Sequence, residues 1–93
     1  MWYSVGMKRW TQIFKALGNV NRLKIIRLLS ERRRMHVSDI SSEIGISFTA
    51  TSRHLILLSN LDVLNSEGTE GHVFYFINPK MPPDLRRATN LFL

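Results

Sequence analysis

The feature that most constrains this fold is a pair of short helical patterns separated by Gly45-Ile46-Ser47. In the first pattern Ser38 offers an N-cap, and two isoleucines four residues apart share one helical face. The glycine ends this helix, because glycine readily adopts the left-handed backbone conformation that follows many helices. The serine of the separator can cap the second helix, which runs from about Phe48 to Asn60. Together the two patterns predict a helix-turn-helix over about residues 38–60.

Two further helical patterns precede this pair. The first, about residues 8–17, repeats apolar side chains at helical spacing and is ended by Gly18-Asn19. Asn21 can cap the second, about residues 22–31, whose apolar side chains are Leu23, Ile25, Ile26, Leu28 and Leu29. A helix this apolar is expected to lie at the centre of the core.

The periodicity changes after Leu61. Residues 63–66 and 72–77 are strand-like, and the glycine-containing segment between them, residues 67–71, is typical of a hairpin turn. Residues 35–37 allow one short extended pairing, and Pro82-Pro83 precedes a last helix over about residues 84–93.

These patterns predict a mainly α fold with a small β-hairpin, in the order helix, helix, helix, turn, helix, hairpin, helix. This is the layout of a winged helix-turn-helix: a three-helix core plus a wing over about residues 63–77. We expect one domain over residues 1–93, because 93 residues suffice for a single core and leave no room for a second.

Charge and composition narrow the class of partner. Thirteen Lys and Arg against seven Asp and Glu give a net charge of +6, which favours nucleic acid or an anionic membrane surface. The chain has no cysteine, which excludes disulfides, thiolate zinc sites and cysteine nucleophiles. No apolar run resembles a signal peptide or approaches the roughly 18 residues of a membrane span. We therefore expect a cytoplasmic protein that does not bind membranes.

The second helix of the pair has two chemically different faces. Thr51, Leu55 and Leu58 share one side of a helix with about 100° per residue and should face the core. Thr49 and Arg53 then point outward, with Ser52 on the flank, in a row suited to the major groove of DNA. Arginine can donate two hydrogen bonds to guanine, and hydroxyls can contact bases or phosphates.

Three stretches of the chain, in the right order and spacing, resemble the ArsR-type family of winged-helix repressors. Its second-helix signature is similar to Ala16-Leu-Gly-Asn-Val-Asn-Arg-Leu-Lys-Ile-Ile-Arg-Leu-Leu29. Its recognition helix is similar to Gly45-Ile-Ser-Phe-Thr-Ala-Thr-Ser-Arg-His-Leu55, and its second wing strand to Gly71-His-Val-Phe-Tyr-Phe-Ile77. The resemblance covers roughly residues 13–77.

The resemblance implies a homodimer that reads a near-palindromic double-stranded DNA operator and acts as a repressor. The first and last helices, about residues 8–17 and 84–93, would form the dimer interface. The chain ends carry much apolar surface, which supports this arrangement: Trp2, Tyr3, Trp10, Leu91, Phe92 and Leu93. A two-fold dimer places its half-sites about one helical turn apart.

The family's DNA-reading positions correspond to Ser47 as the cap and to Phe48, Thr49, Ser52 and Arg53, with a wing contact from His72. Phe48 departs from the polar residue usual in the family, and we expect it to pack against the protein, within reach of a thymine methyl. We expect His54, a histidine frequent in the family, to be hydrogen-bonded within the fold.

Two departures from the family concern metal and the wing. One family metal site uses a Cys-x-Cys pair, where this chain has His36 and Ser38. The other uses Asp and His residues on the last helix, where Asp84 is present without a histidine. We therefore expect no metal site and no cofactor. Glu67 and Glu70 at the wing tip would oppose phosphate contacts.

Other functions leave different signs in a sequence. We do not expect an enzyme, because the three histidines are scattered and no catalytic triad context or phosphate-binding loop is present. A winged helix used as a protein-interaction module, with only non-specific nucleic-acid affinity, remains an alternative. So does binding of structured RNA through the basic half, although the deep, narrow groove of A-form RNA excludes a recognition helix. Whether Arg32-Arg33-Arg34 contacts DNA also stays open.

Overall fold

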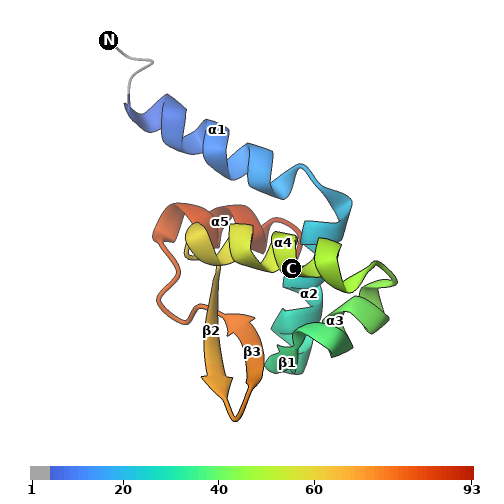
Figure 1. The fold of residues 1–93 in the computed structure, drawn as a ribbon. Helices are drawn as coiled ribbons and strands as arrows, with labels where there is room; N and C mark the ends of the chain where they lie inside the picture. Colours follow the sequence, from blue (N-terminus) through green and yellow to red (C-terminus); the bar gives the residue numbers. More distant parts are fainter. Residues whose placement is uncertain (1–4) are drawn as a thin grey trace.

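A computed structural model describes residues 5–93 of the chain (Figure 1). These residues form five helices and three strands in the order α1 (Val5–Leu17), α2 (Val20–Arg32), β1 (Arg34–His36), α3 (Val37–Ile44), α4 (Phe48–Asn60), β2 (Leu64–Thr69), β3 (His72–Ile77) and α5 (Pro83–Asn90). The order confirms the predicted winged helix-turn-helix.

The turn between α3 and α4 forms as its sequence predicts. Gly45 has φ 80° and its backbone N–H donates to the Ser41 carbonyl at 2.8 Å, which ends α3. The Ser47 hydroxyl accepts a hydrogen bond from the Ala50 backbone N–H at 3.1 Å, which caps α4 at its first turn. The two helices are therefore fixed by local signals at both sides of the turn.

Two predicted caps are wrong. Asn19, not Asn21, caps α2: its side-chain oxygen accepts from the backbone N–H of Asn21 at 3.0 Å and of Arg22 at 3.1 Å. The helix begins two residues early, because the chain turns into α2 directly after α1 ends. Ser38 lies inside α3, since β1 runs into that helix at extended His36, which makes no side-chain cap bond.

The hydrophobic core surrounds α2, as its apolar sequence predicts. Ile25, Ile26 and Leu29 of this helix are buried. They pack in one cluster with side chains from every other helix and from the sheet: Ile13, Ile40, Leu55, Leu58, Val63, Leu64, Tyr75, Met81, Leu85 and Ala88.

The three strands form one antiparallel sheet in the order β1-β3-β2. The extended pairing expected near residues 35–37 is β1, in which Arg34 pairs with Phe76 and His36 with Phe74. The wing turn is tighter than predicted: β2 continues to Thr69, and only Glu70 and Gly71 connect the strands. Both have positive φ, 48° and 80°, which matches the twist of a two-residue hairpin.

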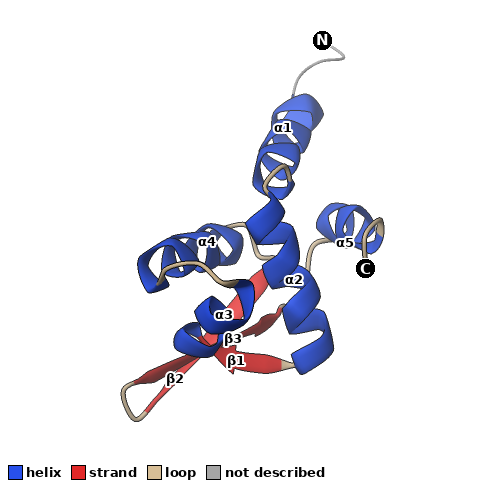
Figure 2. Ribbon diagram, turned by 90° about the vertical axis from the view of Figure 1, so that its right-hand side faces the viewer, coloured by secondary structure: helices blue, strands red, loops and turns tan. Residues whose placement is uncertain are grey.

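The terminal helices lie away from the wing. In both views the β2–β3 hairpin projects from the end of the molecule opposite α1 (Figure 1, Figure 2). Figure 2 shows α4 and α5 on opposite sides of α2. Helix α5 ends at Asn90, three residues before its predicted end. Among the described residues, no helix is long and apolar enough to cross a membrane.

Candidate nucleic-acid interface

Helix α4 has the two faces that its sequence predicts. Thr51, Leu55 and Leu58 are fully buried, and the Thr51 hydroxyl donates to the Ser47 carbonyl at 2.8 Å. Thr49 and Arg53 are exposed and Ser52 is half-buried. A row of two hydroxyls and one guanidinium therefore faces away from the core, on a helix held by three buried side chains.

The first turn of α4 differs from the prediction. Phe48 is 57% exposed instead of packed, because the buried side of α4 begins only at Thr51. Its ring lines a hollow of about 180 Å³ whose other walls come from the start of α3 and from the wing, including His36 and His72. The fold thus brings Phe48 and His72, which the sequence separates, to one hollow.

A cluster of aromatic side chains lies where β3 begins. The exposed His72 ring lies edge-on to that of His36, with centroids 5.1 Å apart, and the His36 ring lies 3.9 Å from that of Phe74. Because His72 and Phe48 line the same hollow, His72 lies near the first turn of α4, to which Phe48 belongs.

The basic run before the wing is largely paired with carboxylates. Arg34 lies 3.1 Å from Glu67 and covers the rings of Phe74 and Phe76, at 4.8 and 5.7 Å from their centroids. Arg32 lies 3.7 Å from Glu43. Arg34 offsets one of the two wing carboxylates, a contact the sequence analysis missed. Only the register of the sheet, with β1 and β2 on either side of β3, could have revealed it.

His54 is held inside the fold, as expected. Its Nδ1 lies 3.2 Å from the Arg22 guanidinium, which also donates to the carbonyls of Lys15 at 3.0 Å and Ala16 at 2.6 Å. Burial, and then the positive charge of Arg22, hold the pKa of His54 below its usual value. Arg22 therefore links the last turn of α1 to α4.

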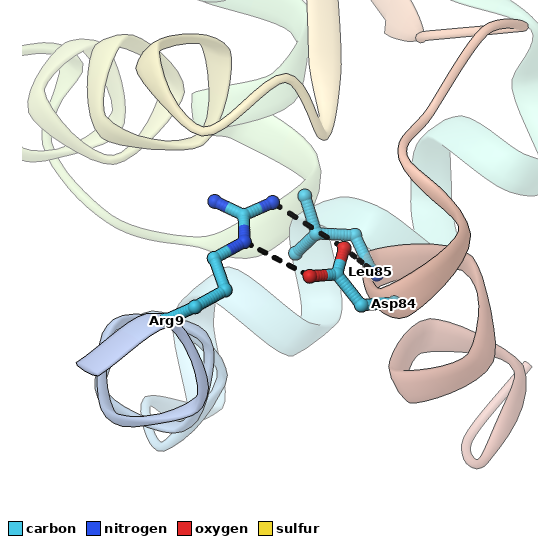
Figure 3. A network of polar contacts seen from close by, with 3 residues as sticks. All are labelled: Arg9, Asp84 and Leu85. Atoms are coloured by element: carbon cyan, nitrogen blue, oxygen red, sulfur yellow. Dashed lines mark hydrogen bonds and ion pairs between the residues drawn. The ribbon is translucent and has the colours of Figure 1, made fainter. Parts of the chain in front are cut away.

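An ion pair joins the first and last helices (Figure 3). Arg9 of α1 donates to both carboxylate oxygens of Asp84 in α5, at 2.9 and 3.3 Å, and Asp84 also accepts from the Leu85 backbone N–H at 2.8 Å. The hydrogen bond from Arg9 is the main cause that keeps the pKa of Asp84 below its usual value. This contact joins α1 to the first turn of α5.

Helix α1 and the chain end after α5 leave large apolar side chains uncovered. Phe14 is 62% exposed and Leu91 86%, and Met7 and Leu93 are also exposed. Trp10 and Phe92 are partly buried against the core, so only part of the predicted apolar surface is free. Trp2 and Tyr3 lie outside the described residues.

Two of the three residues at the family's metal positions are engaged in other contacts. His36 packs against the rings of His72 and Phe74, Ser38 is exposed, and Asp84 is bound to Arg9. Within residues 5–93, no group of three or more His, Cys, Asp or Glu side chains could hold a metal ion.

Known proteins are similar to this chain in sequence. Residues 19–66 match the family model described as bacterial regulatory protein, arsR family. The cadmium resistance transcriptional regulatory protein CadC of Listeria innocua is 41% identical over 64 residues, 69% of this chain and 54% of that protein. The arsenical resistance operon repressor of Escherichia coli is 35% identical over 71 residues, 76% of this chain and 61% of that protein. The chain thus spans little more than half the length of these relatives.

Solved structures show the same architecture. The homodimeric winged helix-turn-helix DNA-binding domain Mb0332 of Mycobacterium bovis, a possible ArsR-family regulator, is 24% identical, with a TM-score of 0.77 over 96% of this chain and 79% of that chain. HlyU of Vibrio cholerae is also 24% identical, with a TM-score of 0.78 over 95% of this chain and 91% of that chain. With a family match over more than half of its residues, the chain belongs to the arsR family of bacterial regulatory proteins and has their winged helix-turn-helix fold.

Proposed function

We propose that this protein binds double-stranded DNA in a sequence-specific manner, as a homodimeric transcriptional repressor built on a single domain. The observation that carries the proposal is the outward row of α4, where Thr49, Ser52 and Arg53 stand opposite the buried Thr51 and its neighbours. Arg53 reads guanine through two hydrogen bonds, and the hydroxyls contact bases or phosphates.

The first turn of α4 supplies the phosphate contacts. Free backbone N–H groups at a helix N-terminus attract anions, and Ser47 and Thr49 add hydroxyls there. Phe48, exposed beside this turn, is placed to touch a thymine methyl, and His72 reaches the backbone from the wing. The Arg34–Glu67 pair removes part of the repulsion that an acidic wing would exert on DNA.

The dimer forms through α1 and α5. Helix α1 exposes Phe14 and the chain end after α5 exposes Leu91 and Leu93. Helix α1 lies at the end of the molecule opposite the hairpin, which leaves the hairpin free for DNA. The Mycobacterium bovis neighbour is described as homodimeric. In such a dimer the two α4 helices meet half-sites about one helical turn apart.

The repressor works without a bound metal. The relatives' names connect them with cadmium and arsenic, but here His36 packs against the rings of His72 and Phe74, and Asp84 is paired with Arg9. Added Cd²⁺ or arsenite should therefore leave the affinity for DNA unchanged. Release of DNA by either at stoichiometric concentration would contradict this part of the proposal.

Selection from a randomised duplex library, at about 0.15 M salt, tests the proposed function. We expect enrichment of a near-palindromic sequence whose half-sites lie about one turn apart. Retention without enrichment, lost as salt rises, would show only attraction to phosphates. That result would favour a protein-interaction module, and preferential retention of an RNA duplex of equal length would favour RNA binding.

A further inference from the structure

A groove of about 550 Å³ runs between the end of α1 and the outer side of α4. Its lining includes three cationic and three aliphatic side chains: Lys15, Arg22, Arg53, Ile56, Leu57 and Leu61. Ligand sites in proteins commonly have volumes of about 300–1,000 Å³, mostly apolar walls and a few polar anchors. The groove has this size and this division of chemistry.

The charge of the groove is not balanced within the protein. No Asp or Glu is among its lining residues, and none of the ion pairs in residues 5–93 includes Lys15, Arg22 or Arg53. The N–H groups of Arg22 donate to two backbone carbonyls and contact the His54 ring, and none of these partners carries a full negative charge. Three cations that share one groove without a carboxylate favour an anionic occupant.

The walls of the groove indicate the chemistry of the ligand beyond its anionic group. Ile56 is 52% exposed and Leu57 37%, so both hold apolar surface in contact with water that a ligand would cover. None of the lining residues is aromatic, which removes the stacking surface that a planar ring or nucleobase would use. A flexible alkyl chain fits these walls better than a flat molecule.

We propose that the groove binds an aliphatic monocarboxylate. Its carboxylate is held by Lys15 and Arg53, and its alkyl chain lies along Ile56, Leu57 and Leu61. The effect of the ligand on repression rests on the proposed DNA binding, because Arg53 belongs both to this groove and to the outward row of α4. A carboxylate that engages Arg53 withdraws it from guanine, so ligand and operator exclude each other and the ligand relieves repression.

The binding site is tested without DNA, by calorimetric titration of the protein with decanoate below its micellar concentration. We expect saturable binding, about tenfold weaker in Lys15→Gln because one charge-assisted hydrogen bond is lost. Lys24→Gln, the same change of charge at an exposed position of α2 outside the groove, should bind decanoate like the unaltered protein. Decan-1-ol, which lacks the carboxylate, should bind much more weakly.

Three results would overturn the site. The first is decanoate binding that never saturates, and the second is equal weakening of that binding by Lys15→Gln and Lys24→Gln. The third is a dimer that does not bind decanoate because a second copy of the chain covers the groove. These measurements contain no DNA, so they fail or succeed independently of the library selection.

The consequence is tested on the selected duplex. Decanoate at ten times its dissociation constant should weaken operator binding at least about tenfold, by mass action. The Lys15→Gln complex should resist the same concentration. A stable ternary complex, with operator affinity unchanged while decanoate is bound, would contradict the shared use of Arg53.

Discussion

At the scale of single residues, polar side chains decide where the helices begin and how they meet. Asn19 accepts two backbone hydrogen bonds at the start of α2, and Ser47 accepts one at the start of α4. Arg22 binds the last carbonyls of α1 and the ring of His54 in α4. These few groups orient the outward row that we assign to DNA.

The cap of α2 gives a direct prediction. Asn19→Ala should lower the free energy of unfolding by about 1 kcal/mol, because two backbone N–H groups lose their acceptor. Urea denaturation measures the change. Asn21→Ala is the matched control, since its side chain does not cap the helix, and it should cost clearly less. Equal costs would show that Asn19 is not the effective cap.

His54 should make stability depend on pH. Its pKa is lower in the folded protein than the ordinary 6.5, so the unfolded chain binds more protons in this range. The free energy of unfolding should therefore be highest above about pH 6.5 and fall as the pH drops toward the folded pKa. His54→Gln should remove this part of the pH dependence. A parallel profile for the variant would contradict the assignment.

At the scale of secondary-structure elements, features set by nearby residues could be predicted from the sequence, and features set by distant segments could not. The start of α4 is predictable because its cap, Ser47, directly precedes the helix and its buried row lies within it. The start of α2 is not, since Asn19 and Asn21 are both good caps and only the path of the chain after α1 selects one. The sequence also did not predict exposed Phe48 or the Arg34–Glu67 contact, because both depend on how distant segments pack.

The wing is stabilised by a long-range contact. Arg34→Ala should accelerate amide hydrogen exchange in β2 and β3, because it removes both the ion pair to Glu67 and the contact with Phe74. Together such contacts contribute about 1 kcal/mol at an exposed site. Arg32→Ala, whose partner Glu43 lies in α3, is the control and should leave exchange in the hairpin unchanged. Unchanged protection in both variants would refute the role of Arg34.

The contact between α1 and α5 is sensitive to acid. The pKa of Asp84 is lowered in the folded protein, so its stabilisation is present above about pH 4 and is lost as the pH falls through the folded pKa. Asp84→Asn should lower stability at neutral pH by up to about 1 kcal/mol and weaken the dimer. Glu70→Gln at the hairpin tip makes the same change of charge. If the dimers of both variants dissociate to the same extent, the Arg9–Asp84 ion pair does not support the dimer interface.

At the scale of the whole molecule, we assign dimer formation and DNA binding to two different surfaces. Exposed apolar side chains of α1 and the chain end, Phe14, Leu91 and Leu93, form the surface that we assign to the dimer, and the outward row of α4 is the surface that we assign to DNA. Helix α1 and the hairpin lie at opposite ends of the molecule (Figure 1, Figure 2). This separation allows two copies to associate without hiding the recognition helices. In the proposed dimer the net charge of +6 per chain would attract the two copies to the phosphate backbone, while the outward row would select the sequence.

The most direct test of this account compares the affinity for the selected duplex with that for a scrambled duplex. In Arg53→Ala the difference between the two should shrink by about 1–3 kcal/mol, because base readout is lost while phosphate contacts remain. Lys24→Ala, which removes the same charge from α2, should weaken both complexes equally and preserve the difference. An unchanged preference in Arg53→Ala would contradict the assignment of α4's outward row as the surface that reads DNA.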